Sequence, residues 1–230
     1  MPNVITKIIN FLLVLLIPIL VVLGSARLLA TDTYLALEYG KTSFPPDVYG
    51  FTSQQRFELA SVNVHYVRAH LPDDALATQK LDATLIYSPR ELSHMADVQS
   101  VFQVIVSVWQ VAFVLLLFLG LILWATGEHR QLAAAVQSGG LFTSAMILTI
   151  ALLAIFAWQS WFSIFHLFFF QPGSWLFSYS DTLIRLFPVN FWFDATLTIS
   201  VLSLMGGLSL AWMGRQWRRS FQKSPYIIKL

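Results

Sequence analysis

The sequence predicts an all-α integral membrane protein with four transmembrane helices and a structured, partly helical extracytoplasmic segment between helices 1 and 2. Of its 230 residues, 57% are hydrophobic and only 11% are charged, and the mean hydropathy is +0.66. Soluble globular domains carry about 25% charged residues. A chain with less than half that supply cannot cover a compact soluble surface, so a soluble enzyme and a disordered chain are both excluded.

The chain contains no cysteine, which excludes disulfide bonds, cysteine-based zinc sites and thiol catalysis. Its net charge of +2 is too small to indicate nucleic-acid binding, so we expect no nucleic-acid partner.

Four uncharged stretches are long enough to cross the bilayer, which takes about 20 apolar residues. We place the crossings at about residues 8–28, 100–125, 140–165 and 194–214, within a single membrane domain over 1–230. The first stretch also resembles a cleavable signal peptide, because a lysine and an apolar run precede small residues. We expect it to remain as a helix.

Basic residues next to the crossings predict the orientation. The tail after the fourth crossing contains five basic residues and no acidic one: Arg215, Arg218, Arg219, Lys223 and Lys229. We therefore expect both termini in the cytoplasm and residues 31–98 and 166–193 outside it. The first outer segment has nine acidic and five basic residues, a balance that suits the outer face.

Residues 31–98 contain two helix-start signals. Thr52 and Gln55 form a capping-box pattern ahead of an amphipathic helix that ends near Pro72. Ser88-Pro89-Arg90-Glu91 combines a serine N-cap, proline at the first helical position and glutamate at the third. This second helix should run into the second crossing, with Glu91, His94 and Asp97 on nearly one face.

The second outer segment is strongly aromatic, since fifteen aromatic residues lie between Phe156 and Phe193. An aromatic belt at the membrane interface explains most of them. It does not explain His166, Asp181 or Arg185. His94 and His166 both fall at the outer boundary beside a crossing, where an ionisable group is costly and usually lines a site.

The other catalytic signals are weak. No nucleophile elbow, phosphate loop or His-Glu-x-x-His motif is present, which disfavours serine-nucleophile hydrolysis. A metal site on the two histidines, with Glu91, Asp97 or Asp181 as third ligand, is an alternative, but no ligand spacing typical of zinc supports it. We expect no metal and no cofactor.

Several segments together resemble the lipoprotein intramolecular transacylases, a family of bacterial four-helix membrane proteins. They are Tyr49-Gly-Phe-Thr52 with Arg56, Pro89-Arg-Glu-Leu-Ser-His-Met-Ala-Asp-Val98, Phe165-His166 with Trp175, and Asp181-Thr-Leu-Ile-Arg-Leu-Phe-Pro188. The resemblance implies transfer of the sn-2 acyl chain of a diacylglyceryl-cysteine lipoprotein to its own N-terminal amine, leaving the N-acyl, S-monoacylglyceryl (lyso) form. It also implies a bacterial cytoplasmic membrane, with the active site at the extracytoplasmic face among membrane lipids. The family's two essential histidines match His94 and His166.

This chemistry needs a deprotonated amine, a polarised ester carbonyl and a proton for the departing oxygen. An amine with pKa about 7.7–8.0 and an imidazole with pKa about 6.5 are matched for proton transfer. We expect His94 to be the base, oriented by Asp97 or Glu91, and His166 the acid or oxyanion partner, although the two roles are interchangeable. Arg56, Arg185, Asp181 and Trp175 are candidate substrate contacts.

Two other functions compete with this one. The first is a non-enzymatic lipid-binding or assembly subunit, and the second is a metal-dependent membrane hydrolase that uses the histidine pair. A transporter is disfavoured because the crossings lack internal charges and repeat symmetry. Structural salt bridges are the competing explanation for Arg56 and Arg90.

Overall fold

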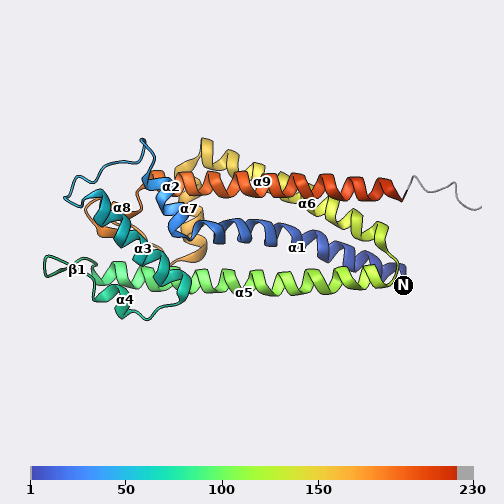
Figure 1. The fold of residues 1–230 in the computed structure, drawn as a ribbon, viewed down its shortest axis with the longest axis horizontal. Coiled ribbons are helices and arrows are strands. Elements are labelled where there is room, and N and C mark those ends of the chain that lie inside the picture. Colours follow the sequence, from blue (N-terminus) through green and yellow to red (C-terminus); the bar gives the residue numbers. More distant parts are fainter. Residues whose placement is uncertain (1, 222–230) are drawn as a thin grey trace, which may run out of the picture. The chain divides into compact units, whose positions relative to one another are not determined.

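The computed structural model describes residues 2–221. Four of its helices are long and apolar enough to cross a membrane: α1 (Asn3–Leu29), α5 (Pro89–Ala125), α6 (His129–Phe156) and α9 (Val189–Ser220) (Figure 1). The shorter elements are α2 (Asp32–Tyr39), α3 (Ser53–Ala69), α4 (Asp74–Ala77), β1 (Lys80–Leu81), β2 (Thr84–Leu85), α7 (Trp158–Phe169) and α8 (Thr182–Leu186). The predicted all-α membrane class with four crossings is confirmed. Lys223 and Lys229 of the basic tail lie outside the described residues.

The chain divides into two compact units. The bundle unit comprises the described parts of residues 1–25, 107–151 and 199–230, and the cap unit comprises residues 26–106 and 152–198. Each of the four long helices contributes residues to both units.

In the bundle unit, α6 and α9 approach each other through glycines. A Cβ atom on Gly140 would lie 2.4 Å from the carbonyl oxygen of Gly207, and one on Gly214 would lie 2.4 Å from the backbone nitrogen of Gln137. Neither position has room for a side chain. Small residues at such contacts let helix backbones pack directly in a membrane, where the lipid supplies no hydrophobic drive for association.

Filling this contact is expected to destabilise the bundle unit. Gly140→Val and Gly214→Val should each cost about 1–3 kcal/mol or more, because overpacking forces the two backbones apart. Gly120→Ala is the matched control, since the nearest atom to its new Cβ would be a Leu132 methyl at 3.9 Å. Thermal unfolding in detergent measures the difference. Equal midpoints for the control and the two valine variants would contradict the close approach.

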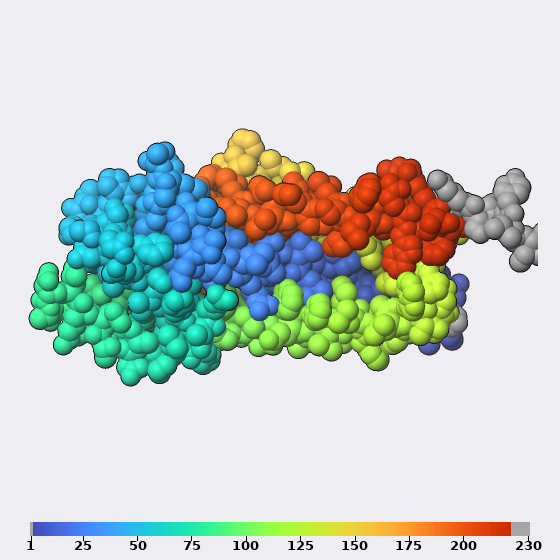
Figure 2. All heavy atoms as spheres, viewed as in Figure 1, coloured from blue at the N-terminus to red at the C-terminus, as the bar shows by residue number. Residues whose placement is uncertain are grey.

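The capping signal before α3 is confirmed. The Thr52 hydroxyl accepts a hydrogen bond from the Gln55 N–H, and the Gln55 side chain accepts one from the Thr52 N–H. The helix ends at Ala69, and its C-cap residue His70 adopts a left-handed conformation with φ of 53°. In the space-filling view, atoms of α2 and α3 lie at the surface of the cap unit (Figure 2).

The cap unit has its own hydrophobic core. Its buried members come from six helices and the connecting loops: Tyr34, Leu35, Phe51, Ala60, Tyr66, Val67, Leu76, Tyr87, Met95, Leu183, Leu186, Phe187, Phe191 and Ala195. The segment between the first two crossings is therefore structured, as predicted. Residues 182–195 belong to the same core.

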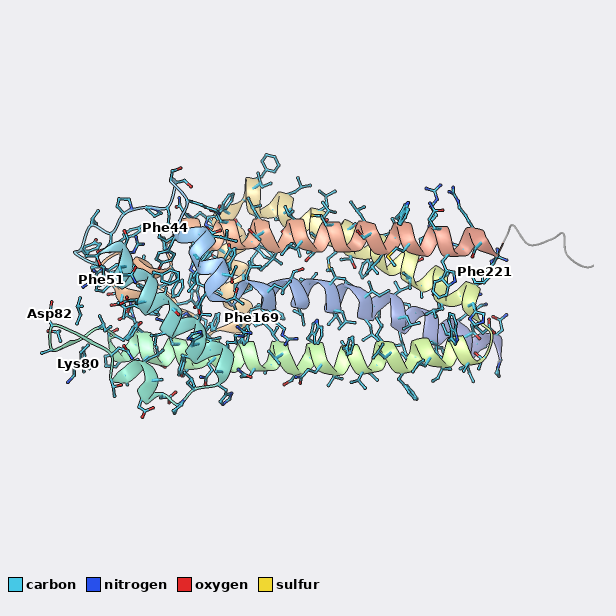
Figure 3. All side chains as sticks on the ribbon, in the orientation of Figure 1. Phe44, Phe51, Lys80, Asp82, Phe169 and Phe221 are labelled. Atoms are coloured by element: carbon cyan, nitrogen blue, oxygen red, sulfur yellow. The ribbon has the colours of Figure 1, made fainter. Side chains whose placement is uncertain are left out.

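The sequence did not indicate the β1–β2 hairpin, in which Lys80 pairs with Leu85 and Leu81 pairs with Thr84. Asp82 and Ala83 form its turn and both have positive φ, at 48° and 68°. Two-residue hairpin turns of this kind normally carry Asn-Gly or Asp-Gly. Because Ala83 occupies the second turn position in place of glycine, the sequence does not indicate a hairpin turn here. Figure 3 labels Lys80 and Asp82 in this hairpin.

The expected third crossing at 140–165 is not one helix. The helix α6 ends at Phe156, and α7 begins at Trp158 after Ala157, whose φ of −141° departs from the helical value. The break leaves no backbone group of Ala157 unpaired: its N–H donates to the Leu153 carbonyl and its carbonyl accepts from the Trp161 N–H. Neither proline nor glycine lies at this site, so no residue there predicts a break in the helix.

Candidate active site

The first turn of α5 positions His94. The Glu91 carboxylate accepts hydrogen bonds from the Ser88 N–H at 2.8 Å and the Ser88 hydroxyl at 2.9 Å. Its other oxygen accepts from the Leu183 N–H at 2.9 Å, which ties α5 to α8. The predicted helix start at Ser88 is thus confirmed. The bonds that hold buried Glu91 all go to groups other than His94, so its carboxylate anchors the helix that carries the histidine.

The helix α7 positions His166 through its own backbone. The Nδ1 atom of His166 lies 2.8 Å from the carbonyl oxygen of Phe162, one turn earlier. A carbonyl oxygen only accepts hydrogen bonds, so Nδ1 carries the proton and the neutral ring leaves Nε2 as an acceptor. Burial lowers the pKa of His166, although this backbone hydrogen bond opposes the shift. The imidazole is therefore neutral, and basic at Nε2, near neutral pH.

Both imidazoles pack against the ring of Phe170. Its centroid lies 4.9 Å from that of His94 and 5.7 Å from that of His166. Phe177 contacts His94 at 5.4 Å, and Trp175 contacts His166 at 4.7 Å. The two histidines therefore share one aromatic neighbour. We call these five residues the histidine cage.

Two polar atoms of the cage are buried without a hydrogen-bond partner among the described residues: Nδ1 of His94 and Nε1 of Trp175. Buried polar groups in native proteins are nearly always paired, so each exception needs an explanation. The indole N–H is only a donor. The cage therefore contains one hydrogen-bond acceptor, Nε2 of His166, and two buried polar atoms that are free to bond a substrate, Nδ1 of His94 and Nε1 of Trp175.

Asp97 and Asp181 do not join the cage. Asp97 is exposed, and within residues 2–221 it has no hydrogen-bond or ion-pair partner. Asp181 accepts from the Ser178 N–H at 2.8 Å and lies 3.5 Å from the Arg90 guanidinium. Arg90 in turn lies over the ring of Phe177, 4.8 Å from its centroid. Arg90 and Asp181 therefore border the cage on the side of Phe177.

Arg185 is bound inside the cap unit. Its guanidinium donates to both carboxylate oxygens of Asp47, at 2.9 and 3.0 Å, and lies 3.4 Å from the centroid of the Phe51 ring. Asp47 also accepts from the Phe51 N–H at 2.8 Å. Burial opposes ionisation of Asp47, but the bonds from Arg185 and Phe51 outweigh it and lower the pKa of the carboxyl.

Arg56 is almost fully buried, with 5% of its surface exposed. It donates to the carbonyl of Arg185 at 3.0 Å and to that of Pro45 at 2.7 Å, and its guanidinium lies over the Phe44 ring. In this arrangement Arg56 holds α3, α8 and the loop before α3 together. Figure 3 labels Phe44 and Phe51, the aromatic partners of the two arginines.

Loss of the Asp47–Arg185 pair is expected to destabilise the protein strongly. Asp47→Asn should cost about 3–5 kcal/mol, because it leaves a buried guanidinium without its counter-charge. Asp181→Asn, which breaks an exposed pair with Arg90, should cost less than about 1 kcal/mol. Because the pKa of Asp47 is lowered on folding, this stabilisation is present above about pH 3.9 and is lost as the pH falls through the folded value. Unfolding midpoints of the two variants, and of the wild type at falling pH, test these predictions. Equal losses of stability in Asp47→Asn and Asp181→Asn would contradict them.

Sequence reasoning missed the aromatic partners of the histidines and the role of the Phe162 carbonyl. In the sequence, Phe170 and Phe177 are indistinguishable from the other residues of the predicted aromatic belt. No residue pattern signals the Phe162 contact, because every residue inside a helix has a backbone carbonyl one turn earlier. Among residues 2–221, no three histidine or carboxylate side chains are grouped as a metal site would need.

The model of the lipoprotein intramolecular transacylase family (Lit) matches residues 11–192 of this chain. The chain belongs to this family. A protein of Aquifex aeolicus described only as uncharacterized is 29% identical over 211 residues, which is 90% of this chain and 94% of that protein.

Solved structures show the same fold. The structure of the lipoprotein intramolecular transacylase Lit from Bacillus cereus superposes with a TM-score of 0.79 at 17% identity, over 96% of this chain and 99% of that one. A second structure of that protein, in which a histidine is replaced by arginine, has a TM-score of 0.71 at 19% identity and covers 96% of this chain and 95% of that chain.

Proposed function

We propose that this transacylase moves the sn-2 acyl chain of a diacylglyceryl-cysteine lipoprotein to the N-terminal amine of the same molecule. The product is the N-acyl, S-monoacylglyceryl lipoprotein. The observation that carries the proposal is the histidine cage, in which both imidazoles pack against Phe170. The hydrogen bond from His166 to the Phe162 carbonyl leaves Nε2 of His166 as the basic nitrogen. An acyl shift needs such a pair and no protein nucleophile, because the substrate amine is the nucleophile.

The tautomer of His166 favours this residue as the base, the reverse of the assignment that we expected first. Its Nε2 takes the proton as the substrate amine attacks the ester carbonyl and forms the new C–N bond. The C–O bond to the sn-2 oxygen then breaks, and a proton goes to that oxygen. We assign His94 the role of acid or oxyanion partner. Holding amine and ester in one site supplies the large effective molarity of intramolecular reactions.

Trp175 is the substrate contact that the cage supports best. Its buried N–H has no partner in the described chain and its ring packs on that of His166. A donor in that place can bond the carbonyl oxygen as negative charge develops on it. Arg56 and Arg185 are engaged with groups of the protein itself. We therefore assign them, with Glu91, to holding the cage rather than to touching substrate.

We place the cage at the outer face of the cytoplasmic membrane. The described basic residues after the fourth crossing, Arg215, Arg218 and Arg219, favour a cytoplasmic C-terminus. Four crossings then put the cap unit outside, where diacylglyceryl lipoproteins are held by their acyl chains. Exposed apolar side chains on α7, with Phe168 at 79% and Ile164 at 62%, suit contact with lipid.

Mass spectrometry of lipoprotein N-terminal peptides from cells with and without this protein tests the function. We expect diacylglyceryl peptides without it and N-acyl lyso peptides with it, at unchanged total acyl mass. An unchanged lipid pattern would favour the non-enzymatic binding function. Loss of one acyl chain as free fatty acid, without amine acylation, would favour the hydrolase.

A further inference from the structure

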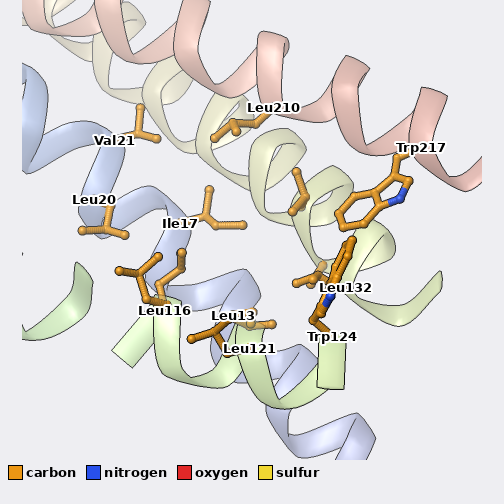
Figure 4. A pocket seen from close by; sticks show the side chains of 14 residues that line it. Leu13, Ile17, Leu20, Val21, Leu116, Leu121, Trp124, Leu132, Leu210 and Trp217 are labelled. Atoms are coloured by element: carbon orange, nitrogen blue, oxygen red, sulfur yellow. The ribbon is translucent and has the colours of Figure 1, made fainter. Parts of the chain in front are cut away.

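A cavity of about 440 Å³ lies within the bundle unit, between α1, α5, α6 and α9 (Figure 4). Its lining is apolar throughout and includes Leu13, Ile17, Leu132, Trp124 and Trp217. No residue of the histidine cage lines it. Its volume falls in the range of small-molecule sites, about 300–1,000 Å³.

The lining selects for hydrocarbon. Apolar cavities much smaller than this one stay dry and take up apolar molecules, because water finds no hydrogen-bond partners there. Four crossing helices surround the cavity, so the hydrocarbon that reaches it in a membrane is the acyl chain of a lipid. The cavity is partly open, which allows a chain to enter while its head group stays outside.

One end of the cavity is marked by aromatic and basic residues. Trp124 and Trp217 lie next to Leu132 (Figure 4), with their ring centroids 6.1 Å apart. The ring of His129 packs on Trp124, with centroids 4.6 Å apart. Tryptophans in this pattern are typical of the level of lipid head groups. Leu20 and Val21 line the cavity away from this end.

The charge at this end is one-sided. Four arginines lie within about one helical turn of the lining residues Leu132 and Trp217: Arg130, Arg215, Arg218 and Arg219. Glu128 is the only acidic residue that the described part of the bundle unit contains. Arg218 also donates to the Gln137 side chain at 3.0 Å, which fixes it between α9 and α6. Basic groups between membrane helices bind anionic lipid head groups.

We propose that this cavity binds one anionic phospholipid, with an acyl chain between the four helices and its phosphate at the arginine end. The site is separate from the proposed acyl transfer, and its lipid is bound rather than converted. Charge complementarity selects the head group, and the dry lining selects the chain.

Native mass spectrometry of the full-length protein, titrated with phosphatidylglycerol or with phosphatidylcholine of the same chains, tests the proposal. We expect one phosphatidylglycerol retained per protein, at least tenfold tighter than phosphatidylcholine. Gly120→Phe places a side chain in the cavity from a position that lines it, and should weaken binding at least tenfold. Val114→Phe, at an exposed position on the same helix that does not line the cavity, is its control.

A second pair of variants tests the head-group contact without altering the cavity. Arg215→Gln combined with Arg219→Gln should remove most of the preference for phosphatidylglycerol, at roughly fivefold for each charge near the membrane surface. Arg68→Gln, an exposed arginine of the cap unit, should leave it unchanged. Equal retention of the two lipids by the wild type, or unchanged binding to Gly120→Phe, would overturn the proposal. So would displacement of the lipid by a diacylglyceryl lipopeptide at equal concentration, which would assign the cavity to the substrate.

Discussion

Replacing either histidine of the cage is expected to lower the rate of acyl transfer at least about 10²-fold, since general acid–base catalysis contributes about 10²–10⁴-fold. His166→Asn is the sharper change, because its amide keeps a donor for the Phe162 carbonyl while the basic Nε2 is lost. His94→Gln keeps polarity in the cage. The double variant should be little slower than the poorer single one, because both residues act on one transition state.

The assay is conversion of a diacylglyceryl lipopeptide to its N-acyl lyso form, with the amount of folded protein measured alongside. His70→Asn is a control at an exposed helix end, where asparagine tolerates the left-handed backbone. His65→Gln is a second control, on an exposed side chain paired with Asp32. Near-wild-type conversion by either cage variant would remove that histidine from the mechanism.

Trp175→Phe is expected to lower kcat by about 10²–10³-fold, the usual cost of losing one donor to a developing oxyanion. Phenylalanine keeps an aromatic ring against His166 but removes the N–H. Because this bond forms in the transition state, KM should change little. Trp161→Phe, on α7 outside the cage, is the matched control and should keep its activity. A wild-type kcat for Trp175→Phe would show that the unpaired indole does not serve the reaction.

Helix starts were predictable from the sequence because their signals are local. Thr52 and Ser88 each cap a helix by bonds to residues three positions away, and both predicted caps are confirmed. His94 and His166 were identified as candidates because an ionisable side chain beside an apolar crossing is costly wherever the rest of the chain lies.

Other features depend on contacts between distant segments. The sequence offered Arg56 as a candidate substrate contact, but its guanidinium is buried and donates to the carbonyls of Arg185 and Pro45. Glu91 was expected near His94 by spacing on one helix face. Its carboxylate instead accepts a hydrogen bond from the N–H of Leu183, which lies 92 residues further along the chain. Spacing along one helix cannot reveal such partners.

Transfer within a single substrate molecule can be measured directly with two lipopeptides. One carries an isotope-labelled sn-2 acyl chain on an unlabelled peptide, and the other carries an unlabelled chain on a mass-labelled peptide. The purified protein is incubated with both lipopeptides, and the masses of the N-acyl lyso products are measured by mass spectrometry. We expect each label to stay with its own peptide, so that no mixed product forms at any time. Mixed products, or release of the labelled chain as free fatty acid, would contradict intramolecular transfer.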